Sequence, residues 1–182
     1  VSDEYDYREN SIYKTYLACD AVSDEVLLRN HYRCNKEIIG FNNKKYYNSK
    51  LKIQSKSNEP EPLVYMDVKS DNTQIKNTSP AEVEEVVEYA LLNKDKSIAV
   101  ITPFVNQKQL IENAIKQNKL SNLVCGTVHA FQGDEKDVVL FSTAISERTS
   151  SGTYNWLKNN KELINVATSR AKEKLVLFAN GK

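Results

Sequence analysis

Short apolar runs recur along the chain, separated by segments in which apolar residues are spaced as in amphipathic helices. Runs of this length, nearly free of charge, are typical of strands buried on both faces of a parallel sheet. A shorter run at residues 26–29 is also consistent with a strand. The remaining predicted strands cover residues 63–68, 97–102, 123–128, 137–144 and 174–179.

The clearest helix signal begins at Ser79. Ser79 and Glu82 have the spacing of a capping box, and Pro80 takes the first helical position. The apolar residues that follow recur at i, i+3, i+4, i+7 and i+8, which places them on one face of a helix. This stripe, predicted to face the core, consists of Val83, Val86, Val87, Ala90 and Leu91.

The other segments complete an alternation of strands and helices. Residues 106–118 have helical periodicity, residues 156–171 look helical, and residues 35–51 are predicted to form a helix broken near Gly40. The polar residues 146–153 are predicted to be a mobile loop. Strands alternating with helices in this way predict an α/β domain with a mainly parallel sheet and helices on both faces.

Composition narrows the class of protein. The chain has 182 residues, a length that suits one domain. Its net charge is only +1, so any nucleic-acid site must be a local patch of positive charge. Cys19, Cys34 and Cys125 form no CxxC pair, so we expect neither zinc nor a disulfide framework, but reduced thiols in a cytoplasmic protein. No apolar run approaches the ~20 residues of a membrane span, and we expect no membrane partner. The chain begins at Val, so we expect a fragment of a longer protein.

Three polar loops follow or precede buried strands. The first carries Tyr32 and Arg33, the second runs from His129 through Gln132 and Gly133 to Glu135, and the third presents Arg170. In parallel sheets functional loops gather at the carboxyl ends of strands, where we expect the second loop to lie. Taken singly, each loop has a structural alternative. These are an arginine packed over a tyrosine, a charged turn, and a cation at a helix C-terminus.

The order of these motifs carries more information than any one of them. An arginine in "HYR" is followed by "ITPFVNQKQLI", then by "TVHAFQGDEKDVV", then by "NVATSRAK" before a last strand. This order resembles the second RecA-like domain of superfamily 1 helicases, and within them the Upf1-like branch. His129 departs from the Asp that this branch usually carries. The resemblance implies a RecA-like three-layer α/β/α domain at residues 26–182, preceded by an irregular segment at 1–25 that continues from a missing upstream domain.

The resemblance also implies a nucleotide site shared between two domains. Arg33 and Arg170 would be catalytic arginine fingers on the γ-phosphoryl group of ATP. Gln132 and Gly133 would lie beside the nucleotide, Glu135 would bind the ribose hydroxyls, and Tyr32 would stack near the adenine. No G-x-x-x-x-G-K-[ST] occurs in the sequence, so Mg²⁺ and the β- and γ-phosphates would be held mainly by the missing first RecA-like domain, and the isolated chain is expected to be inactive.

Single-stranded nucleic acid, DNA in preference to RNA, is the other partner that the resemblance implies. The candidate contacts are Thr102, Pro103, Phe104, Thr127 and His129, although Phe104 also fits a core aromatic and His129 a structural histidine. A non-catalytic binding module derived from a helicase half is the alternative function. An unrelated dinucleotide-binding enzyme is disfavoured, because the chain has five glycines and no G-x-G-x-x-G.

Overall fold

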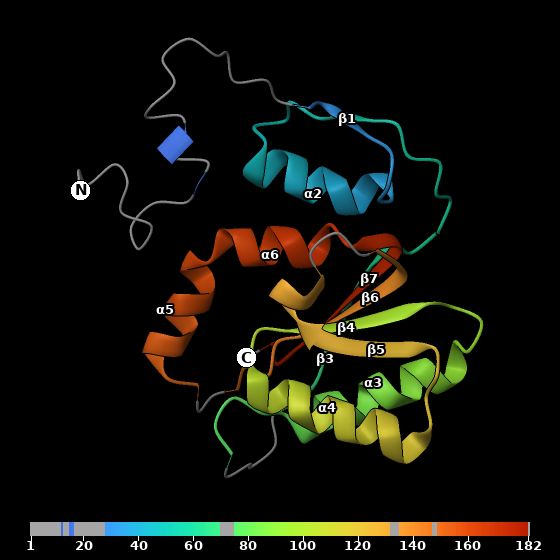
Figure 1. Ribbon diagram of the computed structural model, residues 1–182, viewed down its shortest axis with the longest axis vertical. Coiled ribbons are helices and arrows are strands. Elements are labelled where there is room, and N and C mark those ends of the chain that lie inside the picture. Colours follow the sequence, from blue (N-terminus) through green and yellow to red (C-terminus); the bar gives the residue numbers. More distant parts are fainter. Residues whose placement is uncertain are drawn as a thin grey trace.

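A five-stranded parallel sheet forms the centre of the molecule (Figure 1). The computed structural model describes residues 12, 15–16, 28–69, 75–131, 135–146 and 149–181. Every pair of neighbouring strands in this sheet is parallel, which confirms the sequence prediction. In spatial order the strands are β3 (Leu63–Asp67), β7 (Ala171–Ala179), β6 (Lys136–Ser142), β4 (Ile98–Thr102) and β5 (Leu123–Thr127).

Helices cover both faces of the sheet, as predicted. On one face lie α3 (Pro80–Leu92) and α4 (Val105–Asn118), and on the other lie α2 (Lys36–Tyr46) and α6 (Lys161–Thr168), as Figure 1 shows. The central strand β4 is buried along its whole length. Its side chains alternate between the two layers: Ile98 and Val100 belong to the α3–α4 core, and Ala99 and Ile101 to the α2–α6 core.

The N-terminal part of the domain differs from the sequence prediction. The predicted strand at 26–29 is wrong for the residues that the structure describes, since residues 28 and 29 are not in a strand and Leu28 is 84% exposed. A two-residue strand, β1 (Asn30–His31), pairs instead with β2 (Lys52–Ile53) in a separate parallel sheet. Apart from residues 12, 15 and 16, the expected irregular segment 1–25 lies outside the described residues.

Two helix boundaries also differ from prediction. Helix α2 runs through Gly40 without a break, because the ~1 kcal/mol cost of an interior glycine is outweighed by burial of Ile38 and Ile39. The predicted mobile loop 146–153 is wrong in its C-terminal part, where α5 (Ser151–Asn159) begins with Ser150 capping the N–H of Thr153 at 3.2 Å. The predicted helix 156–171 is therefore two helices, α5 and α6, joined at Asn160.

The predicted capping box at Ser79 forms only in part. Ser79 Oγ accepts from the Glu82 N–H at 3.3 Å, but the reciprocal bond comes from Gln107 of α4, whose Oε1 accepts from the Ser79 N–H at 2.8 Å. The Glu82 carboxylate turns into the protein, where it accepts from Ser142 Oγ at 2.6 Å and from the Ala144 N–H at 3.0 Å. A buried polar network therefore joins α3, α4 and the end of β6.

Candidate functional site

The predicted site loops lie at two opposite edges of the sheet. We call the edge where strands begin the amino edge and the edge where they end the carboxyl edge. Strand β5 ends at Thr127 beside Thr102, the last residue of β4, whereas β6 begins at Lys136 beside Ala171, the first residue of β7. Because these strands are all parallel, the chain passes from the carboxyl edge at Thr127 to the amino edge at Glu135, the residue before β6. The prediction that the whole loop lies at the carboxyl ends is therefore wrong, and Glu135 lies at the amino edge.

Two hydrogen bonds to backbone carbonyls bring the loop of Arg33 against the loop of Arg170 at the amino edge. The thiol of Cys34 donates to the carbonyl of Ser169 at 3.2 Å, and the N–H of Asn35 donates to the carbonyl of Lys172 at 2.7 Å. Arg33 is the neighbour of Cys34 in the chain, and Arg170 is the neighbour of Ser169, so this hydrogen bond brings the two arginines close. The fold thereby places Arg33 and Arg170, which are 137 positions apart in sequence, on the same edge of the sheet.

Glu135 joins this cluster through ion pairs. Its carboxylate pairs with the Arg33 guanidinium and, at 3.3 Å, with Lys172 Nζ. Partial burial lowers the pKa of Arg170, and the nearby positive charge of Arg33 lowers it further. Three cations and one carboxylate therefore meet at the amino edge, an arrangement with an excess of donors suited to a polyanion. We call Arg33, Glu135, Arg170 and Lys172 the amino-edge cluster.

Two neighbours of Arg33 are structural. His31 Nε2 accepts from the Cys34 N–H at 3.0 Å, and burial together with Arg33 lowers the pKa of His31. Burial raises the pKa of the Cys34 thiol to about 12, so this fully buried cysteine is a neutral hydrogen-bond donor. Tyr32, the candidate adenine contact next to Arg33 in the chain, is 68% exposed.

A network of amide side chains positions Arg170. The sequence patterns gave no indication of this network. Asn42 of α2 donates to Asn165 Oδ1 at 3.0 Å and accepts from Thr168 Oγ1 at 2.9 Å. Asn165 in turn donates to the Tyr47 hydroxyl at 3.1 Å. These bonds fix the last turn of α6, which ends two residues before Arg170. The "NNKKYYN" and "NVATSR" segments are therefore bonded to each other, a pairing that periodicity cannot reveal.

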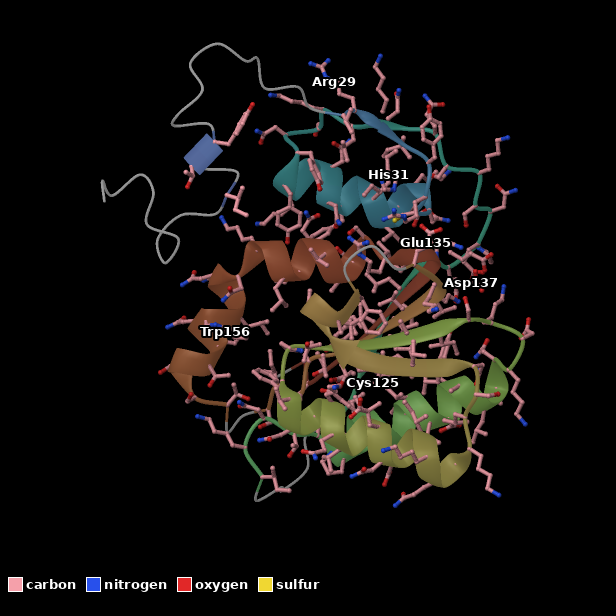
Figure 2. All side chains as sticks on the ribbon, in the orientation of Figure 1. Arg29, His31, Cys125, Glu135, Asp137 and Trp156 are labelled. Atoms are coloured by element: carbon pink, nitrogen blue, oxygen red, sulfur yellow. The ribbon has the colours of Figure 1, made fainter. Side chains whose placement is uncertain are left out.

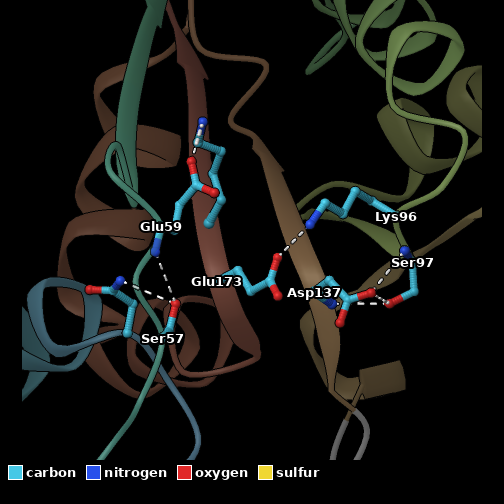
Figure 3. A network of polar contacts seen from close by, with 8 residues as sticks. Ser57, Glu59, Lys96, Ser97, Asp137 and Glu173 are labelled. Carbon is cyan, nitrogen blue, oxygen red and sulfur yellow. Dashed lines mark hydrogen bonds and ion pairs between the residues drawn. The ribbon is translucent and has the colours of Figure 1, made fainter.

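Further charges line the amino edge (Figure 3). Lys96 pairs with Glu173 at 2.8 Å, and the Asp137 carboxylate accepts from the Ser97 hydroxyl at 2.6 Å. The hydrogen bond from Ser97 is the main reason that the pKa of Asp137 is lowered. These contacts hold the starts of β4, β6 and β7 together, next to the amino-edge cluster.

The candidate nucleic-acid residues that the structure describes lie at the carboxyl edge. The Thr102 side chain is fully buried and its Oγ1 accepts from the Phe104 N–H at 3.4 Å, so it shapes the turn into α4. Pro103 and Thr127 are partly exposed. Phe104 is 8% exposed, in line with the core-aromatic alternative. The side chain of His129 and all of Gln132 and Gly133 lie outside the described residues.

Within the described ranges, no three or more His, Cys, Asp and Glu side chains gather as a metal site would need. No helix in the described part of the chain is both long enough and apolar enough to cross a bilayer.

The fold is an α/β domain built on a parallel sheet, and the amino-edge cluster lies where strands β6 and β7 begin. A family model described as an AAA domain, AAA_12, matches residues 8–182. This match covers nearly the whole chain, so the protein belongs to the AAA_12 family of AAA domains.

Relatives among known proteins carry the name helicase. The chain is 28% identical over 178 residues to the uncharacterized ATP-dependent helicase MG140 of Mycoplasma genitalium, covering 86% of this chain and 16% of that protein. It is 30% identical over 181 residues to helicase sen1 of Schizosaccharomyces pombe, covering 85% of this chain and 10% of that protein. The chain thus spans less than a fifth of either relative. The shared region identifies a helicase-type domain of superfamily 1.

A solved structure supports the fold. The C-terminal domain of a possible DNA helicase from Lactobacillus plantarum WCFS1 superposes with a TM-score of 0.54 at 19% identity. The match covers 83% of this chain and 88% of that one. At this identity the likeness is one of architecture.

Proposed function

We propose that this chain is the second RecA-like motor domain of an ATP-dependent superfamily 1 helicase, supplying two arginine fingers and part of a track for single-stranded nucleic acid. The observation that carries the proposal is the convergence of Arg33, Arg170 and Glu135 at the amino edge. The helicase names of its relatives support the reaction class.

The role of the arginines follows from the chemistry of phosphoryl transfer. Negative charge spreads over the γ-phosphoryl oxygens in the transition state, and a planar guanidinium can bind two of them. Without nucleotide, the charge of Arg33 is balanced by Glu135. An arriving phosphate would compete for Arg33, and the Glu135 carboxylate would exchange Arg33 for ribose hydroxyls while it keeps its ion pair with Lys172. Tyr32, Gln132 and Gly133 complete the proposed nucleotide contacts.

The nucleotide and its metal need a second domain. The amino-edge cluster has three cations to one carboxylate, so it suits phosphate oxygens and not Mg²⁺, which prefers carboxylate and water oxygens. We propose that a first RecA-like domain of the same polypeptide holds Mg²⁺ and the β- and γ-phosphates. Mg²⁺ bound there would offset phosphate charge, while this chain's arginines would reach the γ-phosphoryl group from the other side of the cleft.

The carboxyl edge is the proposed nucleic-acid face. Pro103, Thr127 and His129 would contact the strand, with Thr102 and Phe104 shaping the turn beneath it. Single-stranded DNA is the proposed substrate, and the cytoplasm is the proposed location. This assignment puts nucleotide and nucleic acid at opposite edges of one sheet.

The test is turnover in the full-length protein that carries this domain. Arg33→Ala and Arg170→Ala should each lower nucleic-acid-stimulated ATP hydrolysis ~10³-fold or more, as expected for arginine fingers. Arg29→Ala is the matched control, because Arg29 is exposed on the same segment and lies away from Glu135 in Figure 2. If either cluster variant stays within a few-fold of the parent, the arginines are surface cations, and a non-catalytic binding module becomes the better description.

A further inference from the structure

The carboxyl edge carries a small aromatic pocket that the motifs did not indicate. Its lining residues come from three places: Asn77 before α3, Phe104 at the start of α4, and Gly152, Thr153 and Trp156 on α5. Its volume is about 340 Å³, at the small end of the range for ligand pockets. Figure 2 shows Trp156 and Glu135 at opposite ends of the strands of the sheet. We call this feature the Trp156 pocket.

Trp156 is presented to solvent with a rigid backing. The Trp156 and Phe104 ring centroids are 6.2 Å apart with a tilt of 38°. Phe104 is 8% exposed and Trp156 is 45% exposed, so the phenyl ring is fixed in the core and the indole stands above it with much of its surface free. Next to Trp156, Leu157 is 8% exposed and anchors α5 to the body of the domain.

The remaining lining leaves room beside the indole. A Cβ added at Gly152 would have only Ser150 Oγ near it, at 4.0 Å, so the glycine leaves open space on that side of the pocket. Asn77 and Thr153 bring an amide and a hydroxyl, which can bond the edge of a heterocycle. None of the five lining residues is charged, and Lys76, which precedes Asn77 in the chain, is exposed.

From these features we infer that the Trp156 pocket receives an unstacked base of single-stranded nucleic acid, with Trp156 as the stacking residue. This inference rests on the proposed function for the identity of the strand. An exposed indole, backed by a second ring and flanked by neutral polar groups, suits the face and the edge of a base. Stacking of this kind tolerates any sequence and is worth ~1–3 kcal/mol per base. Phe104 then acts as support beneath the indole and does not itself stack.

The chain offers a direct readout, because Trp156 is its only tryptophan. A dT oligonucleotide of about 15 nucleotides, at the upper end of single-strand site sizes, should quench the tryptophan fluorescence of the 182-residue chain as it binds. Binding should also be followed by the anisotropy of a dye on the oligonucleotide, which does not depend on the indole. Quenching at saturating oligonucleotide supports the inference, and its absence overturns it.

Four substitutions sharpen the test by anisotropy. Trp156→Ala should weaken binding by about 5- to 150-fold, the range that corresponds to stacking of one base, and Trp156→Phe should recover most of it. Gly152→Leu should weaken binding to a similar degree by filling the pocket while Trp156 stays in place. Tyr154→Ala is the control, since Tyr154 is 53% exposed on the same helix and does not line the pocket. Equal affinity of Trp156→Ala and the parent overturns the inference.

The outcomes separate the pocket from the motor. Arg33→Ala and Arg170→Ala should leave both quenching and affinity unchanged, since the amino-edge cluster lies at the other edge. Intact quenching combined with wild-type ATP hydrolysis in the arginine variants would reject the motor role and keep the pocket. Loss of ATP hydrolysis in the arginine variants, with no effect of Trp156→Ala on affinity, would support the motor role and reject the base-binding pocket.

Discussion

Glu82 offers the sharpest test of the packing at the carboxyl edge. Its side chain is 1% exposed, and no cation is among the groups that act on its carboxylate. Burial raises the pKa of Glu82 to about 7, although hydrogen bonds from Ser142, Ala144 and Thr143 act in the opposite direction. A carboxylate held only by neutral donors in the core is stabilised less than it would be in water.

The size of the effect follows from the two protonation equilibria. The pKa rises from 4.5 to about 7 on folding, and each tenfold change in proton affinity is worth about 1.4 kcal/mol, so the linkage amounts to about 3 kcal/mol. The folded state binds the proton more tightly. The contribution of Glu82 is therefore favourable below pH 4.5 and is lost as the pH rises to about 7. Above that pH the folded state bears the full cost of the buried charge.

The assay is urea unfolding of the parent and of Glu82→Gln between pH 4.5 and 8. The variant has nothing to titrate at this position, so the parent should lose about 3 kcal/mol more than the variant across that range. Asp137 and Glu59, whose pKa values are lowered by hydrogen bonds from Ser97 and Lys174, titrate in both proteins and cancel in the comparison. Glu84→Gln, on the exposed face of the same helix, is the control and should follow the parent.

Parallel pH profiles for the parent and Glu82→Gln would refute this reasoning. They would mean that Glu82 does not change its protonation preference on folding. The network of Gln107, Ser142 and the Ala144 N–H would then have to stabilise the carboxylate as well as water does.

Three further predictions test other parts of the packing. Gly126→Ala should destabilise the chain by about 1–3 kcal/mol in urea unfolding, because the new Cβ would lie 2.8 Å from the Phe131 ring; unchanged stability would show that this turn yields freely. Asn42→Ala should cost about 1–3 kcal/mol by leaving Asn165 Oδ1 without its donor, while Thr168 Oγ1 keeps its bond to the Ile164 carbonyl at 2.8 Å, and a loss below ~0.5 kcal/mol would count against the amide network. Cys34 and Cys125, each with a pKa raised by burial to about 12, should react with a thiol reagent at pH 7.5 far more slowly in the native chain than in urea; mass spectrometry of the labelled peptides would expose a contrary result.

The sheet was predictable because each strand carries its own signal. In β4 the unbroken apolar run indicates burial on both faces, and the structure buries all five residues. The α3 helix was visible from Ser79, Pro80 and its apolar stripe. Leu91 is the exception, since it is 42% exposed although the periodicity places it with the core residues. Periodicity indicates which face of α3 is apolar. It does not indicate how far along the helix the neighbouring elements cover that face.

The position of the candidate site was harder to predict, because it depends on contacts between distant segments. The residues Arg33, Glu135 and Arg170 were identified by motif order, but the edge of the sheet on which they meet depends on where β6 starts. The rule that loops gather at carboxyl ends does not hold for Glu135, since the connection between β5 and β6 starts at the carboxyl edge and ends at the amino edge. Likewise, the spacing of Ser79 and Glu82 indicated a closed capping box, yet the long-range Gln107 takes the place of Glu82.

The crossing segment explains why so many polar residues stand between two buried strands. Val128 and Phe131 are 3% and 6% exposed and pack in the same core as Ala167 of α6, so the start of the segment is fixed to the α2–α6 layer. Its two ends lie at opposite edges, with Thr127 beside the carboxyl-edge turn and Glu135 in the amino-edge cluster. Helix α6 leads from that same core to Arg170. Under the proposed function, a phosphate that draws Arg33 from Glu135 acts on a segment whose other end lies at the nucleic-acid face. Val128 and Phe131 anchor the start of this segment in the core, and Glu135 ends it among the charges of the amino-edge cluster.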